Sequence, residues 1–255
     1  MPSVSPREAL RALRALLQRL DPTLYALWAA ACTIVSARAF YVYLLKQTGG
    51  EWSAPLDDVF IHFDFARSTA RGHPFEWIDG NGYSSGNTSL SYPFVLALGY
   101  VAGFRDLNLM VWAAIVAAAS VFATLLAARR LFFDGKKPGP ADEPARILSF
   151  LLPPMLLGVG ALDWSFWSGM EVAFFLAVWA VTLVLFYDLV HAEVPRKRRR
   201  WAWALGVSSA MLVVTRPEAA TTVAIFGVAA VLPRLRRQGA GTTIGELLRV
   251  GVPSL

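Results

Sequence analysis

The chain has 255 residues, of which 56% are hydrophobic and 16% are charged, and its mean hydropathy is +0.48. Soluble proteins carry about 25% charged residues, so this composition excludes an ordinary soluble domain and indicates a membrane protein. The single cysteine, Cys32, excludes a disulfide within the chain and a thiolate metal cluster.

Residues 1–21 are predicted to form a basic amphipathic segment on the cytoplasmic membrane surface. Arginines recur there at helical spacing, at positions 7, 11, 14 and 19, with leucines between them. The segment lacks the short apolar stretch and small-residue cleavage site of a signal peptide, so we expect it to be retained.

Seven apolar runs follow, and a span needs about 17–25 residues. The runs are 23–46, 92–104, 107–128, 147–163, 171–190, 201–216 and 218–233. Basic residues concentrate in linkers 129–146, 191–200 and 234–237, which the positive-inside rule places in the cytoplasm with the N-terminus.

The shortest run decides the topology. If all seven runs crossed, linker 129–146 would face outward, against the rule; run 92–104 is therefore predicted to lie at the outer interface. The sequence thus predicts an all-α integral membrane protein with six spans and an outer loop, 47–106, that carries a juxtamembrane helix. This layout puts 18 of the 24 Lys and Arg residues in the cytoplasm. The net charge of +6 then orients the chain, and a nucleic-acid partner is not needed to explain it.

The outer loop begins with paired acids, Asp57 and Asp58, at the start of a predicted amphipathic helix ending near residue 71. One reading is helix capping, which needs only one aspartate; the other is catalysis or metal binding. His62 lies four residues after Asp58, off the apolar stripe. The two side chains make an incomplete site for a divalent metal, and an ordinary structural role for His62 is the alternative.

Residues 72–93 are rich in Gly, Ser and Asn and predict a loop, whose aromatic residues suit either a sugar ligand or an interfacial aromatic belt. Glu171 opens an apolar run, where an acid is also favoured by the helix dipole. Arg216 and Glu218 flank Pro217 between two runs. They fit a salt-bridged turn or, for the arginine, a phosphate ligand.

Three segments together carry a resemblance to a known family. They are Asp57-Asp58 with Ile61, Ala66-Arg67, Gly72-His73-Pro74 and Trp77; Ser168-Gly169-Met170-Glu171; and Thr215-Arg216-Pro217-Glu218. In these motifs and in their order the chain resembles the GT-C superfamily of polytopic glycosyltransferases, such as bacterial arabinofuranosyltransferase B-like and mannosyltransferase-like membrane proteins. Val172 departs from the pattern, which has a small polar residue there.

The resemblance implies an inverting transfer of a sugar from polyprenyl phosphate to an extracytoplasmic glycan, lipid or protein acceptor, at the outer face of the plasma membrane. It implies Asp57 or Asp58 as general base, with Asp57 preferred, and Arg67 and Arg216 as ligands of the donor phosphate. Glu171, His62 and Glu218 become candidate acceptor or metal contacts. The implied reaction needs no nucleotide, and a divalent metal is compatible with it.

The resemblance covers about the N-terminal half of such an enzyme. Residues 22–237 would form the membrane module, and residues 238–255 would begin a further membrane segment. The completing half would follow in a longer chain or be encoded elsewhere. The alternatives are a non-catalytic membrane scaffold or subunit and, less favoured, a transporter, because few charges lie in the middle of the spans and no broken helix pair recurs in two halves.

Overall fold

The structure is a computed structural model that describes residues 6–133 and 143–238. Most of these residues are helical, and they contain no strand beyond an isolated bridge between Glu76 and Tyr83. The helices are α1 (Pro6–Gln47), α2 (Asp58–Ala70), α3 (Tyr92–Val101), η1 (Asp106–Asn108), α4 (Leu109–Phe132), α5 (Glu143–Ser149), α6 (Leu152–Leu157), α7 (Gly160–Trp167), α8 (Val172–Val190), α9 (Pro195–Thr215), η3 (Pro217–Ala219) and α10 (Ala220–Gln238). The predicted all-α class is confirmed.

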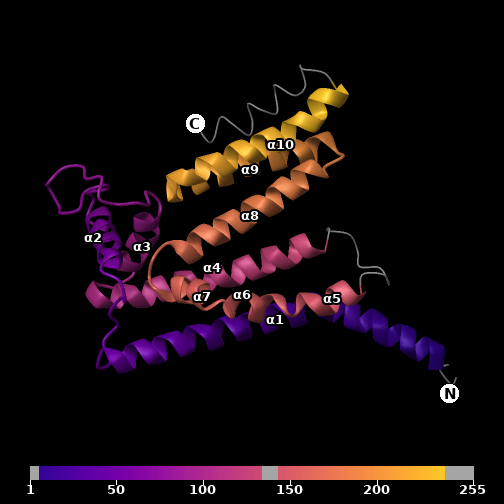
Figure 1. Cartoon of the computed structure of the whole chain (residues 1–255), viewed down its shortest axis with the longest axis horizontal. Helices are drawn as coiled ribbons and strands as arrows, with labels where there is room; N and C mark the ends of the chain where they lie inside the picture. Colours follow the sequence, from indigo (N-terminus) through magenta and orange to yellow (C-terminus); the bar gives the residue numbers. More distant parts are fainter. Residues whose placement is uncertain (1–5, 134–142, 239–255) are drawn as a thin grey trace.

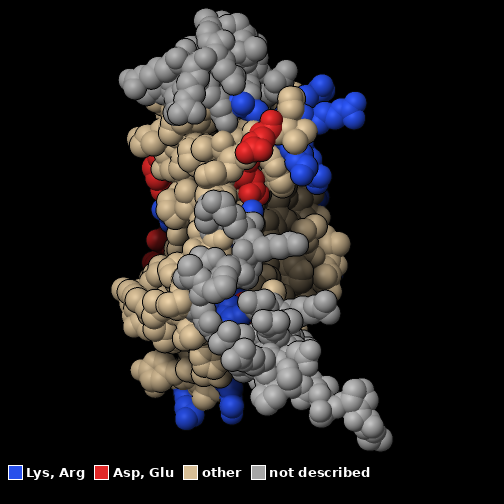
Figure 2. All heavy atoms as spheres, turned by 90° about the vertical axis from the view of Figure 1, so that its right-hand side faces the viewer, with Lys and Arg blue, Asp and Glu red and all other residues tan. Residues whose placement is uncertain are grey.

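The long helices run between two opposite ends of the molecule (Figure 1). One end, called here the loop end, carries α2, α3 and the turns that precede α8 and α10. The opposite end, called the basic end, carries the end of α4, α5 and the start of α9, with arginines 129, 130 and 146 and the basic run 196–200. Figure 2 looks onto the basic end, where Lys and Arg side chains reach out from the surface. The described basic segments thus share one end, as the charge rule requires of segments on one side of a membrane.

Three helical segments in the described residues are long and apolar enough to cross a membrane: Asp21–Gln47, Asp106–Phe132 and Val172–Val190. The number rises to four if a pair bent by 71°, Pro144–Leu157 and Gly160–Trp167, counts as one span. The six predicted spans are therefore not reproduced. In α9 the basic run occupies the first turns and leaves about 22 Å of apolar helix, less than the ~30 Å hydrocarbon core. The apolar helical stretch Pro217–Ala230 is also shorter than a span.

In the structure, neither run 92–104 nor run 147–163 is a continuous membrane span. Run 92–104 forms the ten-residue helix α3, about half the length of a span, as expected of an interfacial segment. The prediction that run 147–163 is one continuous span is wrong, because this run breaks into α5, α6 and α7. Pro153 and Pro154 lack the amide hydrogens that a continuous helix uses, and α6 ends at Leu157 with Gly158 as its C-cap.

The predicted boundary at residue 21 is not a break in the backbone. α1 runs from Pro6 to Gln47 through Pro22, so the basic segment and the first span share one helix. The predicted segment beyond residue 238 lies outside the described residues, as does the part of the 129–146 linker that spans residues 134–142.

Polar atoms of aromatic side chains join α1 to its neighbours. Tyr25 donates a 3.0 Å hydrogen bond to the carbonyl of Leu125 in α4, and Tyr41 donates one of 2.9 Å to the carbonyl of Trp167 in α7. Both tyrosines are buried. Each tyrosine hydroxyl donates to a backbone carbonyl next to the apolar core. The hydrogen bond fixes the helix pairing and leaves the buried hydroxyl satisfied.

At the basic end, an aspartate ties α1 to α4 and α5. Asp21 pairs with the buried Arg129 and lies 3.8 Å from Nε of Arg146. The Arg129 guanidinium also lies 4.2 Å from the ring centroid of Tyr25. These contacts hold α1, α4 and α5 together at the basic end.

Candidate functional site

A tight turn between α7 and α8 forms the floor of the site. Gly169 has a φ of 93°, in the left-handed region that favours glycine. A Cβ at this position would lie 2.8 Å from Sδ of Met110 and 2.9 Å from Cγ1 of Val59. The turn is therefore pressed against the first turns of α2 and α4. This contact fixes Glu171 at the N-cap of α8.

Glu171 brings two distant segments together. Its side chain is fully buried, at 0% exposure, and Oε2 lies 3.1 Å from Nε2 of the equally buried His62 in α2. Its Oε1 lies 2.6 Å from Nη2 of Arg216, which is 33% exposed, and Arg216 Nη1 donates a 3.0 Å hydrogen bond to the exposed Glu218. The contacts of Glu171 have ion-pair distances, but they lack the alignment of good hydrogen bonds. These four residues are called here the Glu171 cluster.

The surroundings of Glu171 favour its ionised form. Burial alone would raise the pKa of the carboxyl, but the contacts with His62 and Arg216 outweigh burial and hold that pKa below its ordinary value. The N-terminus of α8 adds a favourable dipole. Burial opposes the charge of Arg216 too, and its two carboxylate partners still raise its pKa. A charged pair is thus held at the rim of the buried region.

Hydrogen bonds connect the start of α3 to this cluster. The buried Tyr92 donates a 3.0 Å hydrogen bond to the carbonyl of Gly169, and its ring meets that of His62 edge-on at 5.5 Å. Ser91 and Thr215 share a 2.8 Å hydrogen bond between their hydroxyls. These contacts join the loop, the α7–α8 turn and the end of α9 into one support for the cluster.

The paired acids at the start of α2 are separate from the Glu171 cluster. Asp57 is the N-cap, and its Oδ1 accepts a 3.0 Å hydrogen bond from the backbone N–H of Asp58. Both side chains are exposed, and neither forms an ion pair within the described residues. The capping interpretation is confirmed for Asp57, and Asp58 has no capping role. Two exposed carboxylates without an ion-pair partner among the described residues therefore lie at the loop end.

Arg67, the other predicted phosphate ligand, does not join Arg216. Its guanidinium pairs with Asp64 at 3.0 Å and lines a separate cavity of about 200 Å³ on another face of α2. Asp64 also accepts a 3.1 Å hydrogen bond from Nε1 of Trp77, which anchors the 72–91 loop on α2. The role predicted for Arg67 at the donor phosphate stays a prediction.

The pairing of His62 with Asp58 as metal ligands is corrected, because His62 turns inward to Glu171. Within residues 6–133 and 143–238, no group of three or more His, Cys, Asp or Glu side chains is arranged to hold a metal ion. The compatible divalent metal therefore gains no ligand set in this part of the chain. His62 Nδ1 is buried without a hydrogen-bond partner there.

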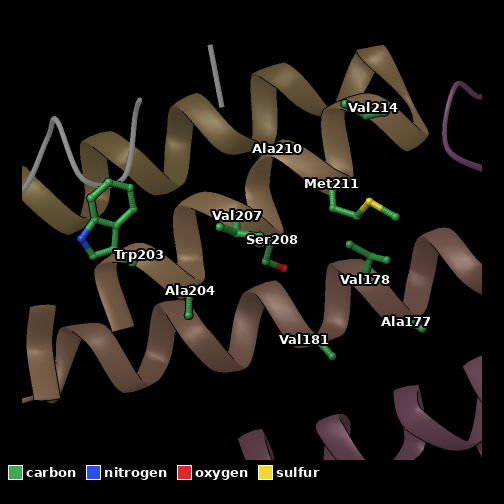
Figure 3. Close-up of a pocket in the computed structure, with 10 residues that line it drawn as sticks. All are labelled: Ala177, Val178, Val181, Trp203, Ala204, Val207, Ser208, Ala210, Met211 and Val214. Carbon is green, nitrogen blue, oxygen red and sulfur yellow. The ribbon is translucent and has the colours of Figure 1, made fainter. Parts of the chain in front are cut away.

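An apolar groove lies along α8 and α9. Its volume is about 830 Å³, and Figure 3 shows its lining on the facing sides of α8 and α9, with Trp203 at one end and Val214 at the other. A second apolar cavity of about 480 Å³ shares Met211 and Val214 with it and reaches Leu90 and Phe94. Arg216 follows Val214 by two residues. The lining of the groove therefore ends two residues before the arginine of the Glu171 cluster, and that arginine lines neither cavity.

Sequence reasoning missed the placement of three residues. His62 was predicted to lie off the apolar stripe, yet it is buried on the face of α2 that also carries Val59 and Ala66. The spacings i−3 and i+4 were a signal for that placement. From the sequence, Tyr92 is indistinguishable from an ordinary interfacial aromatic residue. The positive φ of Gly169 depends on the close approach of α2 and α4, which no local sequence pattern predicts.

Comparison of the chain with protein-family models, with curated proteins and with solved structures gave no match.

Proposed function

We propose that this chain is the membrane module of an inverting glycosyltransferase of the GT-C type. It would transfer a sugar from a polyprenyl phosphate to an extracytoplasmic glycan, lipid or protein acceptor. One observation carries the proposal: the lining of the apolar groove of α8 and α9 ends at Val214, two residues before Arg216, and Arg216 pairs with the buried Glu171. An apolar groove followed along the chain by a cationic side chain suits a lipid chain with a phosphate at its end.

The groove and Arg216 divide the donor between them. The polyprenyl chain lies along Val207 and Met211, whose apolar side chains replace lipid contacts. The phosphate reaches Arg216 by displacing Glu218, the more exposed of its two carboxylates, from Nη1, while Glu171 keeps Nη2 in position. Arg216 then stabilises the charge that develops on the phosphate as it leaves.

We assign the deprotonation of the acceptor hydroxyl to the start of α2. The acceptor hydroxyl attacks the anomeric carbon as the bond from that carbon to the phosphate oxygen breaks, and the hydroxyl proton passes to a carboxylate. Asp57 is the preferred base and Asp58 the alternative. Both are free of ion pairs with described residues, and the neighbouring Val59 packs on the turn that carries Glu171.

The transfer experiment uses the full chain reconstituted in liposomes, together with the completing half if the gene encodes one. Polyprenyl-phosphate arabinose and polyprenyl-phosphate mannose serve as donor probes, with a glycan extract of the cell envelope as acceptor. We expect Asp57→Asn to lower transfer by about 10²–10⁴ without lowering the melting temperature, because the side chain is exposed. Asp58→Asn is the matched control. Loss only in Asp58→Asn would move the base to that residue, and full activity in both variants would refute the assignment.

Donor binding is testable on this chain alone. We expect polyprenyl phosphate to raise the melting temperature more than the uncharged polyprenol does, and we expect Arg216→Gln to remove that difference. Equal shifts by both lipids would show that Arg216 does not read the phosphate.

The orientation is part of the proposal and has its own test. In a Cys32→Ser background, a cysteine placed at Asn108 is expected to react with an impermeant thiol reagent only from outside the cell. Labelling only from the cytoplasm would reverse the proposed topology.

A further inference from the structure

The cavity beside Arg67 lies between α2, the end of α3 and the start of α4. Its lining includes Phe60, Asp64, Arg67, Tyr100, Asp106 and Leu107. Its volume of about 200 Å³ is below the ~300–1,000 Å³ typical of drug-sized ligands, so it has room for one ring-sized group. We call it the α2–α4 cavity.

The cavity is bordered by the face of α2 that begins at Asp57. Residues 60, 64 and 67 follow Asp57 at three, seven and ten positions, and at 100° per residue they fall on one side of the helix. Asp57 has helical dihedral angles, with φ −66° and ψ −36°, so it continues that face. Asp58 is four residues before His62 and belongs to the side that faces Glu171. The paired acids thus lie on different sides of the helix, and Asp57 belongs to the side that carries the lining residues Phe60, Asp64 and Arg67.

The cavity is lined by both polar and aromatic side chains. The Tyr100 hydroxyl accepts a 3.0 Å hydrogen bond from Nη2 of Arg71, and the Arg105 guanidinium lies 5.5 Å from the Tyr100 ring centroid, so the ring is held from two directions. Arg67 uses one nitrogen for Asp64 and retains other N–H donors. Asp106 has a φ of 52° and an exposed carboxylate that pairs with no described residue.

The charge around the cavity argues for a neutral ligand. Arg67, Arg71 and Arg105 are matched in number by Asp64, Asp79 and Asp106 within the cavity wall and its border, and Arg71 pairs with Asp79 at 3.0 Å. A phosphate would need an excess of positive charge, which this border does not provide. A neutral sugar ring fits better, because its hydroxyls need both donors and acceptors and its C–H faces pack on aromatic rings.

We propose that the α2–α4 cavity binds one neutral sugar ring of the acceptor. Phe60 and Tyr100 contact the ring, and Arg67 and Asp106 bind its hydroxyls. The identity of this ring as the acceptor rests on the proposed glycosyltransferase function. The existence of the sugar site rests only on the cavity. The assignment also gives Arg67 a role at the acceptor in place of the donor phosphate.

The test measures binding without a donor. Methyl glycosides of neutral hexopyranoses and pentofuranoses are added singly to the purified chain in detergent, and saturation-transfer NMR reports contact and the dissociation constant. We expect saturable binding of at least one glycoside to the wild type. Leu107→Trp fills the cavity from its edge and is expected to weaken binding at least about tenfold. Asp106→Asn keeps the size but loses a charged acceptor, and is expected to weaken binding about tenfold.

Ile78→Trp is the matched control. Ile78 is an exposed apolar residue in the 72–91 loop that does not line the cavity, so the same substitution there should leave the dissociation constant unchanged. The proposal fails if no glycoside binds, if Leu107→Trp binds as well as wild type, or if inorganic phosphate displaces the glycoside. Glycoside binding that Leu107→Trp removes, in a protein that transfers no sugar, would keep this site and count against the proposed function alone.

Discussion

Replacing Glu171 by glutamine tests whether the buried carboxylate organises the site. The substitution keeps the size and shape of the side chain and removes its charge. It leaves Arg216 with a single carboxylate partner, Glu218, which is 63% exposed. It also leaves His62 facing an amide in a fully buried position.

The expected magnitude follows from the contacts. A unit-charge pair about 4 Å apart interacts with about 4 kcal/mol at an effective dielectric constant of 20, and desolvation of the charges opposes this by several kcal/mol. Breaking a buried pair costs about 3–5 kcal/mol, but Arg216 is one-third exposed and can be rehydrated. We therefore expect a loss of about 2 kcal/mol in the free energy of unfolding. For a chain of this size that is roughly 4–8 °C in melting temperature.

The assay is thermal unfolding of the purified protein in detergent, followed by tryptophan fluorescence. Glu51→Gln is the matched control, because this exposed carboxylate lies at the same end of the molecule without an ion-pair partner among the described residues. Its melting temperature should stay within the range of ordinary surface substitutions, about 0.5 kcal/mol.

The pKa of Glu171 predicts in which direction the difference in melting temperature between wild type and Glu171→Gln changes with pH. The pKa of Glu171 is lower in the folded protein than the ordinary value of 4.5, so its contribution to stability is complete above that pH and is lost as the pH falls through the folded value. The gap between wild type and Glu171→Gln should be constant from pH 7 to about 5.5 and close only in stronger acid. An unchanged melting temperature at pH 7, or a gap that widens in acid, would refute the reasoning.

Three further changes probe the supports of the site. Gly169→Ala should destabilise by more than about 1 kcal/mol and shift Glu171, whereas Gly103→Ala, at a similar φ with open space around it, should show the backbone strain alone; equal melting temperatures would contradict the close packing of the turn. Tyr92→Phe should cost about 1 kcal/mol in the same assay, because its hydrogen bond to a buried carbonyl is lost, and no change would show that the bond is unimportant. On the proposed function, Val207→Trp should raise the KM for a polyprenyl-phosphate donor and leave kcat nearly unchanged, since it obstructs the groove away from the proposed reaction centre; an unchanged KM would place the lipid elsewhere.

The sequence by itself determined the class of the protein and much of its layout. The apolar excess indicated membrane helices, and the spacing of Lys and Arg predicted which segments share an end. Helix α2 and the loop after it were predicted within a residue or two, because their apolar spacing and their Gly and Asn content are local signals. The segments with Glu171 and Arg216 were also singled out from their residues.

Only the tertiary structure decided how these segments meet. Glu171 lies more than a hundred positions from His62, and their contact depends on Gly169 admitting Val59 and Met110 at close range. Hydropathy alone also did not predict that run 147–163 breaks into separate helices, or that the apolar part of α9 is too short for a span. Local patterns report which face of a helix is buried. They do not report which helix covers it, because that choice is made by long-range packing, and here long-range packing places His62 and Arg216 on the same carboxylate.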